Sequence, residues 1–297
     1  MKRPNLFIVG APKSGTTAMA TYLRAHPDVF MPARKELGYF GSDLTYSKRF
    51  IRDPDEAHYL AHFAGWSGEA VAGEASVWYL YSRTAAAEIR AFSPDARIII
   101  MLRNPVDVIY SNYHQFLYNE NEDIRDFEAA LAAESDRKAG RRLPSRMLLR
   151  EGLYYTDTVR FAAQIERYLE VFGRERVHVI LFDEFQRDTP KTFRGVLEFL
   201  EIDPEFTTDF EVVNPNKRSR SRAFRHLYTS APFRAAARCF PRLAQRVYEP
   251  IRALNTEFVP RAPLDPATRL QLSRELAPEV RKLAALLERD LSRWLPV

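Results

Sequence analysis

The sequence has almost no cysteine and no long hydrophobic run. Cys239 is the only cysteine among 297 residues, which excludes an internal disulfide framework and a cysteine-based zinc site. A single cysteine is typical of a reducing compartment, so we expect a cytoplasmic protein. No apolar run approaches the roughly 20 residues of a membrane-spanning helix. The apolar run in the opening MKRPNLFIVG is shorter than a signal-peptide core, and we expect it to form a strand.

Repeats, low-complexity linkers and a basic tail are also missing. A chain of this length with 46% hydrophobic residues is expected to form one α/β domain over residues 1–297. The net charge of +5 and the pI near 9.2 favour anionic ligands in general. Scattered arginines without interleaved aromatic residues disfavour a nucleic-acid-binding surface. The histidines show no ligand spacing with carboxylates, so no metal site is predicted.

The stretch VGAPKSGTT, residues 9–17, predicts an anion-binding turn between a strand and a helix. It follows the apolar run LFIV, and Gly10 and Gly15 let the backbone curl close to a ligand. The first N–H groups of a helix lack partners and point into such a turn. The nucleotide triphosphate loop, G-x-x-x-x-G-K-[ST], has its lysine after the second glycine. Here Thr16 stands in that place, and Lys13 lies inside the loop.

Four short apolar runs predict the buried strands of a parallel sheet: residues 6–9, 70–75, 97–102 and 177–182. Amphipathic segments lie between them. In residues 157–173, for example, apolar side chains recur at helical spacing and Gly173 supplies a C-terminal cap. Strands that alternate with helices imply a three-layer α/β sandwich around a central parallel sheet. Ligands of such folds gather at the carboxyl ends of the strands.

A second anion-binding element, RNPVDVIYSNYHQF, follows the strand predicted at residues 97–102. Asn104 is suited to cap a helix and Pro105 to its first turn, which places Arg103 at the strand end and Ser111 on the helix. Both side chains could then reach one anion beside the first loop. Taken alone, an arginine in this place is as often a surface ion-pair partner.

Together with KELGYF at residues 35–40, these elements resemble the sulfotransferases that use 3′-phosphoadenosine 5′-phosphosulfate (PAPS). The resemblance covers nearly the whole chain: residues 151–185 look like the family's Gly-x-Tyr helix and following strand, and residues 283–294 look like the C-terminal helix of bacterial members. It implies the family's fold, similar to that of P-loop nucleotide-binding proteins, with a helical C-terminal extension from about residue 219. It also implies a transferase that needs no metal and releases adenosine 3′,5′-bisphosphate.

The resemblance assigns the first loop to the 5′-phosphosulfate. Donors would come from Ser14, Gly15, Thr16 and Thr17, and Lys13 would lie at the bridging oxygen, where it stabilises the charge that develops on the departing 5′-phosphate. A lysine in this role replaces a metal ion.

The resemblance also assigns a clamp for the 3′-phosphate, formed by Arg103 and Ser111. Bidentate arginine geometry suits a terminal phosphate. Lys217 and Arg218, within the basic run NPNKRSRSR, match a late loop that folds over the same phosphate, although a run of this kind is more often a solvated loop.

An acceptor loses a proton as it takes the sulfuryl group, so a general base should face the loop. In heparan-modifying and many bacterial members, a glutamate in a similar Lys-Glu-x-x-x-Phe context is the base, and here this glutamate is Glu36. Cytosolic small-molecule members use a histidine before the arginine strand, but none lies between His62 and His114. Without the resemblance, Glu36 would be interpreted as a solvated carboxylate paired with a neighbouring basic residue.

The acceptor side of the site is less defined. Glu74, in GEASVWYL, is a second carboxylate at a strand end that could orient the acceptor. The polar segment at residues 115–150 is predicted to be a lid whose helix RDFEAALAAE covers the acceptor. The acceptor could be a carbohydrate, another polar metabolite, a lipid or a polyketide, and the oligomeric state stays open. The amphipathic residues 227–254 could pack on the domain, form a dimer or rest on a membrane surface.

Two alternatives belong to other classes of protein. VILFDE at residues 179–184 looks like the magnesium-binding strand of ATPases, which would predict an ATP-dependent kinase. The displaced lysine and the RNPVDVIYS element disfavour that interpretation, and Asp183 and Glu184 are then expected to be structural caps of the next helix. The other alternative is a non-catalytic anion-binding module.

Overall fold

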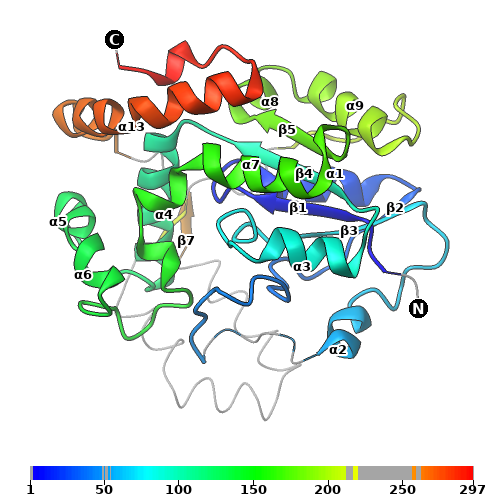
Figure 1. The fold of residues 1–297 in the computed structure, drawn as a ribbon, viewed down its shortest axis with the longest axis horizontal. Coiled ribbons are helices and arrows are strands. Elements are labelled where there is room, and N and C mark those ends of the chain that lie inside the picture. The colour runs from blue at the N-terminus through cyan, green and yellow to red at the C-terminus, as the bar shows by residue number, and fades with distance from the viewer. Residues whose placement is uncertain are drawn as a thin grey trace. The chain divides into compact units, whose positions relative to one another are not determined.

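The computed structural model describes residues 3–48, 50, 53, 55–211, 217–219, 256–258 and 262–296. The chain divides into two compact units, Met1–Val212 with Leu264–Val297, and Val213–Pro263. The larger unit holds the sheet and its helices (Figure 1). In the smaller unit, β6 (Lys217–Ser219) and β7 (Thr256–Phe258) pair antiparallel.

A five-stranded parallel sheet forms the centre of the larger unit, which confirms the predicted fold class. Its strand order is β2-β3-β1-β4-β5. The strands are β1 (Leu6–Gly10), β2 (Val29–Phe30), β3 (Val71–Ala75), β4 (Arg97–Leu102) and β5 (Val177–Leu181). All five residues of β1 are buried, which explains why LFIV is apolar throughout and does not alternate. The two-residue β2 is too short to give a periodic pattern.

Helices cover both faces of the sheet (Figure 1). On one face, Tyr22 of α1 packs against Phe185 of α8 and Phe193 of α9. On the other face, α7 contacts α3 and α13. The helices described are α1 (Thr16–Ala25), α2 (Glu56–Ala61), α3 (Ala85–Phe92), α4 (Pro105–Asn119), α5 (Phe127–Ala132), α6 (Glu134–Lys138), α7 (Phe161–Phe172), α8 (Phe182–Arg187), α9 (Thr189–Leu200) and α13 (Pro266–Leu287), with 3-10 turns at Glu151–Leu153, Asp157–Val159, Arg174–Arg176 and Ser292–Trp294.

Local signals fix the ends of two predicted helices. Asn104 Oδ1 accepts a hydrogen bond from Val106 N at 3.0 Å, so the cap of α4 is confirmed. Gly173, with φ at 79°, ends α7 as predicted. The helix begins at Phe161, four residues later than the periodicity predicts, because Asp157–Val159 form a separate 3-10 turn and Arg160, with ψ at 70°, is not helical.

The C-terminal extension is helical over the 22 residues of α13, which begins after its cap Asp265. Thr256–Phe258, also within the extension, form a strand, which their β-branched and aromatic residues favour. The amphipathic residues 227–254 lie outside the described residues. Across the part of the chain that the structure describes, no helix has the length and apolar character needed to cross a membrane.

Candidate active site

The loop between β1 and α1 lies at the carboxyl edge of the sheet, where the sequence predicts an anion site. Gly15, with φ at 91°, precedes α1 and has no side chain that could cap the first turn of this helix. The first N–H groups of α1 are therefore left to bind a ligand or water. Ser14 and Thr16 are buried within the loop. A Cβ on Gly15 would lie 3.1 Å from the Phe182 ring, so both backbone and packing require glycine here.

Three cationic side chains gather at this loop: Lys13 belongs to the loop itself, and Arg103 and Lys35 reach it from other segments. Lys13 Nζ donates to Gln115 Oε1 of α4 at 3.2 Å. Arg103 Nη1 donates to the carbonyl oxygen of Lys13 at 3.4 Å. Lys35 Nζ donates to Thr16 Oγ1 at 3.0 Å. A donor set of this charge fits a ligand that carries several negative charges.

Arg103 and Ser111 lie where the sequence places them, after β4 and two turns into α4. The Arg103 guanidinium lies 4.9 Å from the centre of the Phe182 ring and 3.9 Å from Asp107. Burial lowers the pKa of Arg103, and Asp107 and Asp183 oppose that shift; an arginine stays charged throughout. Ser111 is buried, so its hydroxyl group can contact only a ligand that is itself enclosed by the site.

Glu36 adopts a left-handed conformation, with φ at 60°. Its backbone N–H donates to Ala75 O at 3.0 Å, and its Oε2 accepts from Val77 N at 3.0 Å. Lys35 Nζ lies 3.0 Å from Glu36 Oε1 and equally far from Thr16 Oγ1. Glu36 is therefore paired with a neighbouring basic residue, Lys35, as expected for a solvated carboxylate. The same ammonium group also connects Glu36 to Thr16 of the first loop.

Glu74 lies inside the protein, with 1% of its surface exposed. Its carboxylate accepts hydrogen bonds from Ser76 Oγ at 2.7 Å, Tyr59 Oη at 2.9 Å and Tyr79 Oη at 3.1 Å. Burial raises the pKa of Glu74 to about 7, although the three hydroxyl donors oppose this and the charge of Glu36 adds to it.

The raised pKa of Glu74 predicts a stability that falls as pH rises. The folded protein holds this proton more tightly than the unfolded chain, so the stabilisation is complete below about pH 4.5 and is lost as pH rises through about 7. From pH 5 to pH 8 the free energy of unfolding should fall by about 2 to 3 kcal/mol more in the wild type than in Glu74→Gln. Urea unfolding of both proteins at the two pH values measures this difference.

Glu88→Gln is the matched control for that experiment. Glu88 accepts from Gly41 N at 2.6 Å and Ser42 N at 3.1 Å. Burial acts to raise the pKa of Glu88, but these and other hydrogen bonds bring it below its ordinary value. Its contribution is lost only as the solution becomes acidic, so Glu88→Gln should keep the wild-type change between pH 5 and pH 8. Equal pH dependence in the wild type and Glu74→Gln would contradict the prediction.

Asp183 and Glu184, the residues behind the kinase alternative, lie in the first turn of α8 and have C-terminal partners. Asp183 Oδ2 accepts from Trp294 Nε1 at 2.8 Å and lies 3.0 Å from Arg293 Nε, and Glu184 pairs with Arg289. The two carboxylates thus link α8 to the chain end and do not cap the helix by side-chain hydrogen bonds. No cluster of possible metal ligands occurs among the described residues.

The side chains of Lys217 and Arg218 lie outside what the structure describes; only their backbone, in β6, is placed. In the segment proposed as a lid, Arg137 Nη2 and Glu122 Oε1 form a fully buried ion pair at 2.7 Å. Tyr155 Oη also donates to Glu122, at 2.7 Å. Breaking such a pair costs about 3–5 kcal/mol. The covering role stays a prediction, and any opening would have to leave this anchor in place.

Residues 4–207 match the model of the sulfotransferase family. The crystal structure of a sulfotransferase from Alicyclobacillus acidocaldarius is 32% identical, with a TM-score of 0.75 over 99% of both chains. The bifunctional heparan sulfate N-deacetylase/N-sulfotransferase 1 of Caenorhabditis briggsae is 26% identical over 72% of this chain and 24% of its own length. For the carbohydrate sulfotransferase 15 of Mus musculus, the identity is 26% over 68% of this chain and 44% of its own. The chain spans less than half the length of these curated relatives.

These findings define an α/β fold with a glycine-bearing loop at the carboxyl edge of its parallel sheet. The chain belongs to the sulfotransferase family.

Two contacts of the site were not predicted. Lys35 adjoins Glu36 in the sequence, but only the fold brings its ammonium group to Thr16. Gln115, the partner of Lys13, lies four residues after Ser111 and so shares its face of α4, a spacing that could have identified it.

Proposed function

We propose that the protein transfers the sulfuryl group from PAPS to a hydroxyl or amine group of a small-molecule or carbohydrate acceptor. The observation that supports this most is the Lys35 ammonium group, which lies between Thr16 Oγ1 of the loop and Glu36 Oε1. It sets a carboxylate that can accept a proton next to a loop that can hold a phosphosulfate. The three cationic side chains around the loop suit an anionic donor.

The proposal gives the donor two binding regions. Ser14, Gly15, Thr16 and Thr17 hold the 5′-phosphosulfate together with the first N–H groups of α1. Arg103 and Ser111 hold the 3′-phosphate, and Lys217 and Arg218 are proposed to cover it. When bound, PAPS supplies the activated sulfuryl group, and adenosine 3′,5′-bisphosphate leaves. No metal is assigned to the site.

Lys13 acts on the departing 5′-phosphate, and Glu36 acts on the acceptor. Lys13 places its positive charge where the 5′-phosphate becomes more negative as the bond to sulfur breaks. Glu36 takes the proton from the acceptor oxygen or nitrogen as the new bond to sulfur forms. Val77 N–H and Lys35 hold the Glu36 carboxylate in place for this step.

The acceptor is proposed to be a carbohydrate or another polar metabolite. Relatives of this chain are named as heparan sulfate and carbohydrate sulfotransferases, and its overall positive charge suits a polar or anionic acceptor. The cytoplasm stays our predicted compartment.

The test is calorimetric titration of the protein with adenosine 3′,5′-bisphosphate, with magnesium-ATP and adenosine 5′-monophosphate as comparison ligands. The bisphosphate should bind most tightly. Arg103→Ala should weaken this binding about 10- to 100-fold, because it removes a charged donor from the 3′-phosphate. Tighter binding of magnesium-ATP would contradict the proposal and favour a kinase.

Arg97→Ala is the matched control for Arg103→Ala. Arg97 begins β4 and Arg103 follows its end, and their side chains are 28% and 27% exposed. Arg97 donates to Leu200 O at 2.6 Å and pairs with Glu201. It lies at the amino-terminal ends of the strands, whereas the loop lies at their carboxyl ends. Its removal should leave bisphosphate binding unchanged. An equal loss in both variants would show that Arg103 does not contact the ligand.

A further inference from the structure

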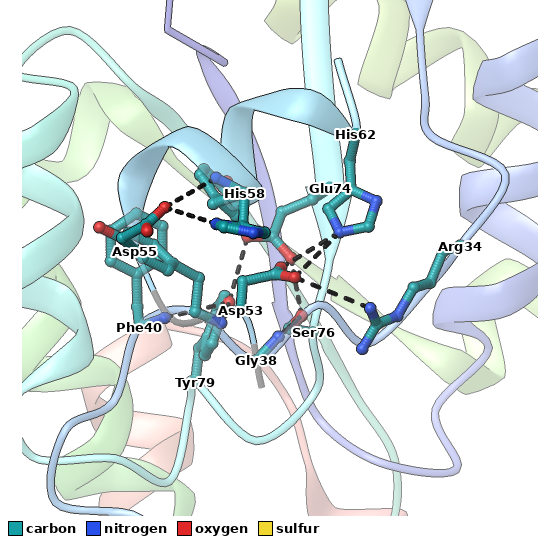
Figure 2. Close-up of polar contacts among 12 residues, drawn as sticks. Arg34, Gly38, Phe40, Asp53, Asp55, His58, His62, Glu74, Ser76 and Tyr79 are labelled. Carbon is teal, nitrogen blue, oxygen red and sulfur yellow. Dashed lines mark hydrogen bonds and ion pairs between the residues drawn. The ribbon is translucent and has the colours of Figure 1, made fainter. Parts of the chain in front are cut away.

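Two of the three hydroxyl groups bound to Glu74, those of Ser76 and Tyr79, also contact the backbone of residues 38–40 (Figure 2). Ser76 Oγ accepts a hydrogen bond from Gly38 N at 3.3 Å. Tyr79 Oη accepts from Tyr39 N at 2.8 Å and from Phe40 N at 3.3 Å. Three consecutive backbone N–H groups are thus held by two side chains whose own hydrogens go to one buried carboxylate.

The carboxylate determines which way these hydroxyl groups point. A hydroxyl group has one hydrogen and two lone pairs, and its hydrogen rotates toward the best acceptor. In its ionised form Glu74 takes the hydrogens of Ser76 and Tyr79, so their lone pairs are left for the backbone N–H groups. Without that acceptor, neither hydroxyl group has a fixed orientation, and its hydrogen bonds with the backbone N–H groups are weakened.

The segment held in this way begins with the proposed base. Glu36 and Gly38 both have left-handed backbones, with φ at 60° and 66°. For a glutamate this conformation is unfavourable and persists only where neighbours impose it. Ala75 O and Val77 N hold Glu36 from the end of β3, and the hydroxyl pair holds the three residues from Gly38 onward.

Two other carboxylates hold the flanks of the same segment. Asp53 lies 3.9 Å from Arg34 and 3.1 Å from His62 (Figure 2). Glu88 holds Gly41 and Ser42. Of the three carboxylates, Glu74 is the most deeply buried and holds the residues nearest to Glu36 on its C-terminal side. Burying a carboxylate among hydroxyl groups is costly, which favours a function for it beyond packing.

We infer that Glu74 is a positioning residue: through Ser76 and Tyr79 it fixes the backbone of residues 36–40, and with it the direction of the Glu36 carboxylate. Because its side chain is buried beneath this segment, Glu74 does not contact an acceptor. The inference rests on the proposed function, since it gives the positioned residue the role of base.

Hydrogen exchange of the ligand-free protein tests the positioning directly. In Tyr79→Phe the amides of Tyr39 and Phe40 lose their acceptor, and their exchange should speed up about tenfold. Tyr168→Phe is the matched control, because Tyr168 is an equally buried tyrosine whose hydroxyl group donates to the carbonyl oxygen of Tyr79 at 2.9 Å and not to residues 36–40. These amides should exchange at the wild-type rate in the control.

Turnover provides the second measurement. It is followed as the transfer of the radiolabelled sulfuryl group of PAPS to water or to heparan sulfate saccharides. In Tyr79→Phe kcat should fall about 10- to 100-fold, with little change in KM for PAPS, since the base is misplaced while the loop is intact. Glu74→Ala should show the same loss. Glu74→Gln should retain most of the turnover, because its amide oxygen can still accept from the tyrosines and its NH2 group can donate to Ser76.

The outcomes separate this inference from the proposed function. Wild-type exchange at residues 38–40 in both Tyr79→Phe and Glu74→Ala would overturn the positioning role. Faster exchange with unchanged kcat would overturn the link to Glu36. If Glu36→Gln retained full turnover, the proposed base would be wrong, while the exchange rates would still decide whether Glu74 orders the segment. If one variant failed to fold, the other would decide.

Discussion

Replacing Lys13 with alanine is expected to lower kcat about 10²- to 10³-fold while it weakens bisphosphate binding less than about tenfold. The reason lies in when its charge is needed. Donors from the loop and Arg103 already hold the ground state, whereas the extra negative charge on the 5′-phosphate exists only as its bond to sulfur breaks. Release of radiolabelled sulfate from PAPS gives kcat, and calorimetry with adenosine 3′,5′-bisphosphate gives the affinity.

Lys35→Ala tests whether the charge has been assigned to the correct lysine. Both ammonium groups lie at the loop, but Lys35 contacts Thr16 and Glu36, whereas Lys13 contacts Gln115. Loss of Lys35 should disturb the base as well as the loop, so it should alter the pH dependence of kcat. If Lys13→Ala kept wild-type kcat and Lys35→Ala lost it, the stabilising charge would belong to Lys35.

The central sheet was predictable because its strands are buried on both faces. A run such as RIIIML in β4 can be apolar at every position only where neither face meets water, and that indicates a parallel sheet between helices. The strand order could not be predicted in this way. β1 lies between β3 and β4 because of packing across the sheet, which local periodicity does not contain.

The loop residues of the site were predictable from geometry, since the strand, the glycine turn and the helix are consecutive in sequence. The confirmed cap of α4 placed Arg103 and Ser111 for the same reason. Contacts between distant segments were not predictable. Lys35 reaches Thr16 across 19 residues and Lys13 reaches Gln115 across 102. No spacing rule connects the two residues of either pair, although the position of Gln115 on the Ser111 face of α4 was a signal for Gln115 itself.

Glu74 shows the limit most clearly. The sequence indicates a carboxylate at a strand end and suggests that it orients the acceptor. Its burial and its bonds to Tyr59 and Tyr79 depend on α2 and on the turn after β3 closing over it. The structure therefore directs the hypothesis for this residue from the acceptor toward the Glu36 segment.

Replacing Glu36 with glutamine is expected to lower kcat about 10²- to 10⁴-fold, the usual contribution of a general base. Glutamine has nearly the same size, and its amide oxygen can still accept the Val77 N–H bond, but it cannot take a proton at neutral pH. Because the first loop is untouched, bisphosphate affinity measured by calorimetry should stay within about threefold of the wild type.

Glu56→Gln is the matched control, since it removes an equally exposed carboxylate that also pairs with one cation. The side chains of Glu36 and Glu56 are 37% and 43% exposed, and Glu56 accepts from Arg3 at 2.8 Å as Glu36 accepts from Lys35 at 3.0 Å. If only the loss of a surface ion pair mattered, the two variants would behave alike, with an effect of about 1 kcal/mol or less on stability and none on kcat. Replacing a general base, in contrast, lowers kcat and leaves the affinity for adenosine 3′,5′-bisphosphate unchanged. Full turnover in Glu36→Gln would therefore require that the acceptor proton pass to another group or to water.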